Sequence, residues 1–493
     1  IESDRFIGMA PDAEIVLVSF KSAEDASVNV SNAIKYIFDY AESQGKPCVI
    51  NLSLGTQDGP HDGTSPFDRM ADSLQGPGRI IVGSAGNHRT NKFHAQGSST
   101  FKSFIDFRQA ITTANAGGNI DVWGDEGQDI EVSILVYNVN TGAEADRVKI
   151  YPSDEAEVSL GRNVSGKVAI ASERNPANNK IHVSMTSGIT SVRSNYAVAL
   201  EVAAVTPGNM HVWADNIKLG LTSRGLEGFT DGDASTIVEI GGTGKRIISV
   251  GAYTTRNAYT PFNSSSEQKL DETVGALSSF SSCGPTADGR VKPLVSAPGC
   301  YISSAISSFD LSGSSPVSYA YEIDGNYVRY GYMEGTSMSS PAVAGIVATW
   351  LQAYPALTPE QIAEVIKHTS RTDAFTGEIP AEGSNDWGYG KIDAYAGLKE
   401  CLTMSSVTAL PIEDASSIHF QSEGNTMNVL FGANHSTATI DIYTASAVKV
   451  MSRSLTDVTP GSDTSIDLSQ LSKGVYILSV RTDSAVKTIK FSK

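Results

Sequence analysis

The segment from Tyr332 to Trp350, YMEGTSMSSPAVAGIVATW, places a serine where nucleophilic chemistry is possible. Ser337 stands at the start of a predicted helix, whose positive end and backbone N–H groups favour negative charge on an attacking oxygen. Gly335 would let the backbone approach a substrate closely. The Gly-Thr-Ser sequence taken alone favours an ordinary capped, buried helix. A serine here becomes reactive only if a base, oriented by a carboxylate, completes the site.

The elements around this serine predict an α/β domain. Ala13–Phe20, Cys48–Leu54 and Arg79–Ala85 are short apolar runs without polar alternation, which we interpret as strands of a parallel sheet. Between the first two runs, apolar residues recur at the spacing of a helix with one buried face, at Val30, Ala33, Ile34, Ile37, Phe38 and Ala41. Pro359–Ser370 predicts a further helix, with Thr358 as its cap and Pro359 at its first position.

Two long stretches have a different pattern. From about Ser98 to Ile237, short alternating segments are separated by Gly, Asn and Asp, which predicts a β-sandwich. The α/β pattern returns at Lys245–Thr254, so this sandwich is an insertion. After Leu402, seven short strands predict a second, terminal sandwich. Ser304–Tyr332 is a smaller Tyr- and Ser-rich insertion that forms either a lid or a long loop.

Composition limits the classes of function. The chain has 493 residues, too many for a single core, and we expect two to four domains. Its net charge of −17 and its lack of basic clusters argue against nucleic-acid binding. Four cysteines are too few for a disulfide framework or a metal cluster, although Cys283 and Cys300 could pair. No apolar run is long enough to span a bilayer, and the start has no signal-peptide pattern. We therefore interpret the chain as a processed or truncated product.

Several motifs, in order, carry a family resemblance. The stretch GTSMSSPAVAG resembles the serine signature of the subtilisin family. GMAPDAEIVLVSF is similar to the segment that follows the family's catalytic histidine helix, INLSLG to its substrate-pairing strand, and VGSAGN to a pocket wall with the oxyanion asparagine. FSSCGPTADGRVKPLVSAPG and GYGKIDAYAG are similar to the segments around the serine region. The resemblance covers residues 1–98 and 240–400 and implies a subtilisin-like fold.

The resemblance also implies roles for individual residues. Ser337 would be the nucleophile, and Asn87, with the Ser337 backbone N–H, would bind the oxyanion. Six residues would flank the side chain on the acyl side of the scissile bond: Ser53, Leu54, Gly55, Ser84, Ala85 and Gly86. Their small size would permit a sizeable apolar side chain. The sequence departs from the family at Leu294, where Asp is usual, and at Cys283, where Arg is common. Both departures concern local packing.

The base and acid of the family lie before GMAP, in segments that residues 1–493 lack. His61, although followed by Asp62, comes after the substrate strand, and we interpret it as a loop residue near the cleft that touches substrate. His88 adjoins Asn87 and so cannot sit behind the serine. The other six histidines have no supporting pattern and are expected on the surface or in a core: His94, His182, His211, His368, His419 and His435. Cleavage before Ile1, truncation, or loss of catalysis would each explain why the base and the acid are missing from residues 1–493. The intact serine motif favours a fragment of a working protease.

The additional domains carry weaker resemblances. The long interval between Asn87 and Ser337 is similar to that of subtilisin relatives from anaerobic bacteria with an inserted sandwich, which could restrict access to the cleft. Trp123 and Trp213 lie in its strands, and filling of the sandwich core is favoured over a carbohydrate platform. The ending VKVMSRSL…LSKGVYIL…KFSK resembles the C-terminal sorting domains of Bacteroidetes secreted proteins, which implies export and surface attachment.

The sequence thus predicts an α/β, three-layer, subtilisin-like parallel-sheet core with two β-sandwiches. The domains are expected at 1–98 and 241–402 for the core, 99–240 for the inserted sandwich and 403–493 for the terminal one. We expect a secreted or cell-surface bacterial serine endopeptidase whose partners are protein or peptide substrates and its own cleaved N-terminal segment. The alternative is an inactive peptide- or glycan-binding protein or an adhesin. No cofactor is expected apart from structural Ca²⁺, for which Thr230–Thr236 is the nearest candidate and an ordinary turn is favoured.

Overall fold

The structure is a computed structural model of the chain. It describes residues 7–19, 26–108, 117–215, 218–262, 264–307, 317–323, 326–407, 418–423, 425–432, 434–444, 448–459, 462–483 and 486–493. The chain divides into two compact units, Ile1–Lys399 and Glu400–Lys493, and each is described by itself.

A parallel sheet forms the centre of the first unit. Its four strands are β1 (Cys48–Leu52), β2 (Arg79–Ser84), β14 (Ile248–Tyr253) and β17 (Val295–Pro298), and they lie side by side in that order. All three pairings are parallel, so the carboxyl ends of these strands meet at one edge of the sheet. The predicted α/β sheet is confirmed, and its strands are buried apolar runs as expected.

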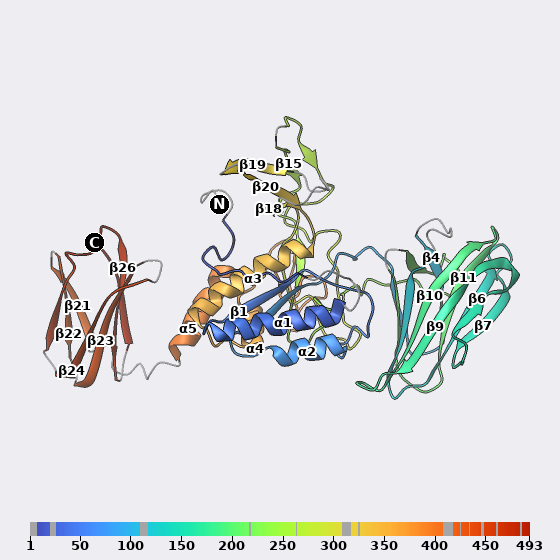
Figure 1. The fold of residues 1–493 in the computed structure, drawn as a ribbon, viewed down its shortest axis with the longest axis horizontal. Helices are drawn as coiled ribbons and strands as arrows, with labels where there is room; N and C mark the ends of the chain where they lie inside the picture. Colours follow the sequence, from blue (N-terminus) through green and yellow to red (C-terminus); the bar gives the residue numbers. More distant parts are fainter. Residues whose placement is uncertain are drawn as a thin grey trace. The chain divides into compact units, whose positions relative to one another are not determined.

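Helices cover both faces of this sheet (Figure 1). On one face lie α1 (Ala26–Ser43) and α2 (Pro66–Leu74), and a core cluster joins Val30, Ile34 and Phe38 of α1 to alternate residues of β1. The periodicity that predicted α1 is therefore confirmed. On the other face, α3 (Thr336–Ala353) packs across all four strands. Two further helices are α4 (Pro359–Thr369), with the predicted Thr358 cap, and α5 (Ala394–Val407).

The prediction of a strand at Ala13–Phe20 is wrong for the part that the structure describes. Residues 13–19 belong to no strand, and Phe20 lies outside the described residues. The side chains of Ile15 and Leu17 are 81% and 88% exposed. A β-strand needs a neighbour to pair its backbone groups, and among the described residues the sheet ends at β1. The apolar run and the outer edge of β1 are both without a pairing strand in that range.

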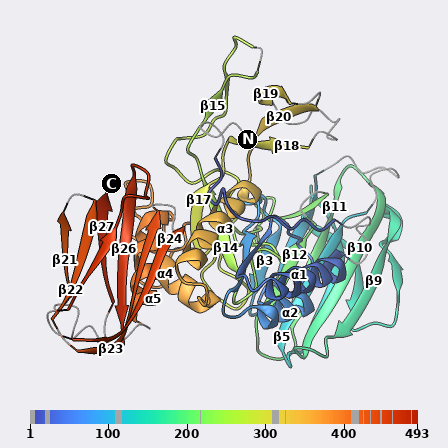
Figure 2. The ribbon, with the colours of Figure 1, turned by 60° about the vertical axis from the view of Figure 1, so that its left-hand side comes forward.

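The inserted sandwich consists of two antiparallel sheets (Figure 2). The six-stranded sheet has the order β3 (His94–Gly97), β12 (Met210–Ala214), β5 (Asn119–Glu126), β10 (Lys180–Val192), β9 (Val164–Arg174) and β8 (Glu157–Ser159). The five-stranded sheet has the order β13 (Leu219–Thr222), β4 (Phe101–Phe107), β11 (Tyr196–Ala204), β6 (Ile130–Asn138) and β7 (Ala143–Tyr151). A short 3₁₀ helix, η2 (Gly161–Asn163), precedes β9. Alternating apolar side chains from both sheets fill the space between them.

The smaller insertion forms a sheet of its own, which Figure 2 shows apart from the central one. Its strands are β18 (Ile302–Ile306), β20 (Asn326–Met333) and β19 (Val317–Ile323), in that order. A short hairpin of β15 (Ala258–Tyr259) and β16 (Gln268–Lys269) lies beside it, because Tyr259 contacts Tyr301 and Tyr332 at ring-centroid distances of 4.6 and 4.8 Å. The described part of the insertion therefore forms an antiparallel sheet.

The second unit contains the seven predicted strands. One sheet has the order β21 (Ile418–Glu423), β22 (Thr426–Phe431) and β25 (Asp463–Asp467). The other has the order β24 (Lys449–Val458), β23 (His435–Thr444), β26 (Val475–Thr482) and β27 (Val486–Ser492). Both sheets contribute to one apolar core, so the predicted terminal sandwich is confirmed.

Candidate active site

Ser337 is the second residue of α3, and the turn before it requires glycine. Gly335 caps the helix with a φ of +140°, a backbone conformation that residues with a side chain rarely adopt. A Cβ on Gly335 would lie 3.1 Å from Asn87 Nδ2 and 3.6 Å from the Ser337 backbone nitrogen. In the first turn of α3, the Met338 N–H donates to the Gly335 carbonyl at 3.0 Å and the Thr336 N–H donates to the Asn87 side chain. The Ser337 side chain is half-buried.

Thr336 orients the Asn87 side chain. The backbone N–H of Thr336 donates to Asn87 Oδ1 at 2.8 Å, and the Thr336 hydroxyl donates to the same oxygen at 2.9 Å. The Thr336 hydroxyl also accepts the Gly86 N–H at 3.1 Å, and the residue is fully buried. Oδ1 accepts two hydrogen bonds from Thr336, and the amide NH₂ of Asn87 lies beside Gly335, 3.1 Å from where a Cβ would stand. The structure thus brings Asn87 and Ser337 together, and Thr336 is a positioning residue that the sequence argument did not identify.

A proline links the serine turn to the end of β1. Pro341 has no N–H to donate to the carbonyl four residues earlier, which is that of Ser337. The Ser53 hydroxyl donates to this carbonyl instead, at 2.8 Å. Asn51 extends the connection, since its Nδ2 donates to Ser53 Oγ at 3.0 Å and its Oδ1 accepts the Ser340 hydroxyl at 2.5 Å. The Ser337 carbonyl, which has no partner within α3, therefore holds the chain after β1 beside the serine.

The six residues predicted on the acyl side lie at the ends of two neighbouring strands. Ser53, Leu54 and Gly55 follow β1, while Ser84, Ala85 and Gly86 end or follow β2. Parallel pairing of β1 with β2 places the two groups side by side. The Ser84 hydroxyl reaches the Leu54 carbonyl at 3.4 Å. The structure brings these six residues together next to Ser337.

His61 is not near the cleft surface, so the interpretation that it touches substrate is wrong. Its side chain is fully buried, and its ring nitrogens bond the carbonyls of Ile237 and Gln57 at 2.8 and 3.0 Å. The ring stacks on Trp213 with 3.7 Å between centroids. Burial lowers the pKa of His61, and the two carbonyl contacts oppose this shift only in part. The glycines on either side allow the loop to fold inward in this way.

The other histidines contact residues other than Ser337 or belong to other elements of the chain. His94 bonds Asp233 at 2.8 Å and His211 at 3.0 Å, and the His182 ring bonds Asp121 at 2.9 Å. His88 packs edge-on against Phe93. His368 lies on α4, and His419 and His435 lie in the second unit.

The two tryptophans are buried, but not between the sheets of the sandwich. Trp123 pairs with His211 and His182 across the sheet, whereas Val122 pairs with Val212 and Val183, so strand alternation puts them on opposite faces. Trp213 shares the face of Trp123 and stacks on His61 and His94. The expected filling of the sandwich core is thus corrected: this outer face meets the loop of residues 56–65. Lys180 and Asp62 form an ion pair of 2.7 Å in the same contact.

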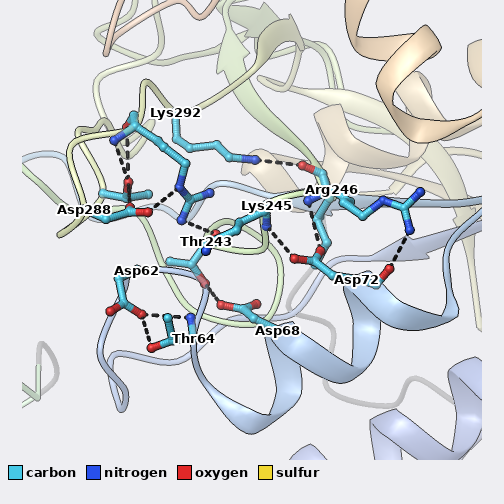
Figure 3. Close-up of polar contacts among 12 residues, drawn as sticks. Asp62, Thr64, Asp68, Asp72, Thr243, Lys245, Arg246, Asp288 and Lys292 are labelled. Carbon is cyan, nitrogen blue, oxygen red and sulfur yellow. Dashed lines mark hydrogen bonds and ion pairs between the residues drawn. The ribbon is translucent and has the colours of Figure 1, made fainter. Parts of the chain in front are cut away.

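Two buried carboxyl groups, Asp68 of α2 and Glu239, lie near that loop. Figure 3 shows Asp68 beside Thr243. Thr243 Oγ1 lies 2.7 Å from Asp68 Oδ2 and 3.1 Å from Glu239 Oε2, and the His61 backbone N–H donates to Glu239 Oε1 at 2.6 Å. Burial raises the pKa of Glu239 to about 7 and that of Asp68 well above its usual range. Burial therefore disfavours the ionised form of both groups.

The remaining candidates are assigned to protein contacts. In Thr230–Thr236, Asp231 accepts the Ser223 N–H at 2.8 Å and Asp233 bonds His94, as in an ordinary turn. No cluster of three metal-ligating side chains occurs in the part of the chain that the structure describes. Cys283 and Cys300 do not pair, and the Cys283 thiol donates to the Ala234 carbonyl.

Comparison with known proteins agrees with this geometry. A family model described as the subtilase family matches two overlapping stretches, residues 2–217 and 132–397. The serine protease AprX of Bacillus subtilis is 36% identical over 165 residues, which is 33% of this chain and 31% of AprX. The minor extracellular protease Vpr of the same species is 26% identical over 374 residues, 74% of this chain and 40% of Vpr. The chain thus spans less than half the length of these relatives.

A solved structure and a second family model complete the comparison. The Clostridium perfringens CspB protease superposes with a TM-score of 0.55 at 20% identity, covering 78% of this chain and 74% of CspB, which indicates a shared fold. Residues 413–493 match a model described as a secretion system C-terminal sorting domain. None of the helices in the described ranges is both long and apolar enough to cross a bilayer.

Proposed function

This chain belongs to the subtilase family, and from that premise we propose that it is the serine-bearing part of a secreted endopeptidase. Ser337 is the nucleophile, and Asn87 and the Ser337 backbone N–H bind the oxyanion. The observation that supports this most strongly is the double hydrogen bond from Thr336 to Asn87 Oδ1, which directs the asparagine NH₂ at the serine turn. A preorganised donor beside the serine is what stabilisation of an oxyanion requires.

The proposed reaction is acyl transfer. Ser337 Oγ attacks the substrate carbonyl carbon while its proton passes to a base, and the carbonyl oxygen gains the negative charge. Asn87 Nδ2 and the Ser337 N–H donate to that oxygen. The base then protonates the departing amine, the C–N bond breaks, and water hydrolyses the resulting ester. Residues 53–55 and 84–86 hold the substrate before the scissile bond.

We propose that the base and its carboxylate come from a polypeptide outside residues 1–493, most simply from the protein's own N-terminal segment. Two features of the described chain support this partner. Among the described residues, no strand pairs with the outer edge of β1, and the apolar side chains of Ile15, Leu17 and Val18 are exposed. A strand added between residues 13–19 and β1 would pair both and bury these side chains.

The protein is secreted or cell-surface, because its last 81 residues (413–493) match a sorting domain. Its substrates are then proteins or peptides outside the cell. The tryptophans of the inserted sandwich are 5% and 2% exposed, so they offer no open face for stacking on a sugar. A glycan-binding role finds no support in these residues.

Turnover of a fluorogenic peptide tests the proposal. Purified residues 1–493 are expected to be almost inactive, and co-expression with the segment encoded upstream is expected to restore hydrolysis by several orders of magnitude. Ser337→Ala in the assembled protein is expected to abolish it. Full turnover by residues 1–493 alone would contradict the proposed partner, and activity that survives Ser337→Ala would contradict the proposed nucleophile.

A further inference from the structure

The segment of residues 236–240 lies between the two groups of acyl-side residues. The Val238 N–H donates to the Ala85 carbonyl at 3.1 Å, and the Glu239 N–H donates to the Thr56 carbonyl at 3.0 Å. The segment around residues 236–240 is thus bonded to the chain after β2 on one side and to the chain after β1 on the other.

Val238 points at both. A Cβ built on Gly55 would lie 2.4 Å from one methyl carbon of Val238, and a Cβ built on Gly86 would lie 2.7 Å from the other. The two methyl groups therefore touch the two glycines at the positions where these would carry side chains. Val238 is only 2% exposed, so its isopropyl group fills the gap between the glycines.

The surrounding contacts prevent Val238 from moving aside. Valine is β-branched, and its χ1 is restricted more than that of an unbranched side chain. The next residue, Glu239, is fixed by the His61 N–H at 2.6 Å and by Thr243. The Gly242 N–H closes a turn onto the Val238 carbonyl at 3.1 Å. The group between the glycines is therefore rigid.

We infer that Val238 is the floor of the acyl-side pocket and restricts the residue before the scissile bond to a small side chain, such as that of alanine or glycine. This inference rests on the proposed function, because it takes residues 53–55 and 84–86 as the substrate-flanking groups. It replaces the expectation that small walls permit a sizeable apolar side chain: the walls are small, and a third residue occupies the space between them.

Binding of cleavage-product peptides tests the inference without requiring catalysis. Dansyl-Ala-Ala-Pro-Ala and dansyl-Ala-Ala-Pro-Phe, each with a free terminal carboxylate, are titrated into residues 1–493 and followed by fluorescence anisotropy. The wild-type chain is expected to bind the Ala peptide at least about tenfold more tightly than the Phe peptide, since misfit in a closed pocket costs 10- to 200-fold. Val238→Gly is expected to reverse this order, and Val238→Ala to give an intermediate ratio.

Two controls separate the possible failures. Ile237→Ala removes a neighbouring buried side chain of the same segment and should leave the ratio unchanged. Thermal unfolding of each variant shows whether it is folded, and Val238→Ala is the milder substitution if Val238→Gly does not fold. Peptides that bind the wild-type chain with equal affinity, or with a ratio that both folded Val238 variants preserve, would overturn the role of Val238 alone. If neither peptide binds any variant, the acyl-side assignment fails, and the proposed function fails with it.

Discussion

At the scale of single residues, the candidate site depends on the hydrogen bonds that orient the Asn87 side chain. Its Oδ1 accepts two hydrogen bonds from Thr336, so the direction of the NH₂ group is set before any substrate arrives. The family resemblance named Ser337 and Asn87 as candidates. It could not identify Thr336 or Val238, because their roles follow from contacts across more than 150 positions of sequence, with Asn87 and with Gly55 and Gly86.

The first prediction concerns Asn87. In the assembled enzyme, Asn87→Ala should lower kcat by roughly 10²–10³, because one preorganised donor to the oxyanion is lost. KM should change little, since the ground-state carbonyl needs this donor less. Steady-state kinetics with a fluorogenic peptide measure both constants, and Ser337→Ala defines the background. A variant with unchanged kcat would show that Asn87 is only a turn residue.

The second prediction concerns the pH dependence of stability. Burial raises the pKa of Glu239 from 4.5 to about 7, so the folded chain retains a proton that the unfolded chain releases. The associated stability is fully present below pH 4.5 and is lost as the pH rises through about 7, on the order of 3 kcal/mol. Glu239→Gln should reduce this decline. Chemical unfolding between pH 4.5 and 8 measures it, and a decline as steep as in the wild-type chain would contradict the assignment.

At the scale of elements, the sequence predicted most of the central sheet and its helices, and failed at one strand. The apolar run of residues 13–19 has the composition of a strand, but pairing is a property of two segments, and only one of them lies in the described chain. The capped helix α4 was predictable because its capping box is entirely local. The outward orientation of Trp123 and Trp213 was not predictable. Alternation along a strand assigns residues to two faces of the sheet, but it does not tell which face meets the sandwich core.

The third prediction concerns the contact between the inserted sandwich and the loop of residues 56–65. Trp213 stacks on His61 of this loop, whereas Trp123 stacks on His182 within the sandwich. Trp213→Ala should destabilise the first unit by about 3–5 kcal/mol and increase amide hydrogen exchange in residues 56–65. Trp123→Ala is the matched control and should leave exchange in that loop unchanged. Equal exchange in both variants would show that the stack does not hold the loop.

At the scale of the whole molecule, the chain consists of two units with separate apolar cores. Composition alone predicted several domains, and the strand pattern predicted the terminal sandwich. The two family models match different parts of the chain: the subtilase model matches within residues 2–397, and the sorting-domain model matches residues 413–493.

The fourth prediction is that the two units unfold independently. Calorimetry of residues 1–493 should show a separate transition for the sandwich of residues 418–493, because its core contains residues of that unit alone. Removal of residues 408–493 should eliminate this transition and leave the others within about 2 °C. A single transition that shifts on truncation would show that the two units stabilise each other.

The central claim is that Ser337 is a competent nucleophile whose base arrives on another polypeptide segment, and covalent labelling tests it most directly. Purified material is treated with a fluorophosphonate probe and analysed by gel and intact mass, with and without the upstream segment. We predict that Ser337 is labelled only when a second, smaller polypeptide accompanies residues 1–493. A Ser337 that stays unlabelled in the presence of that polypeptide would contradict the account.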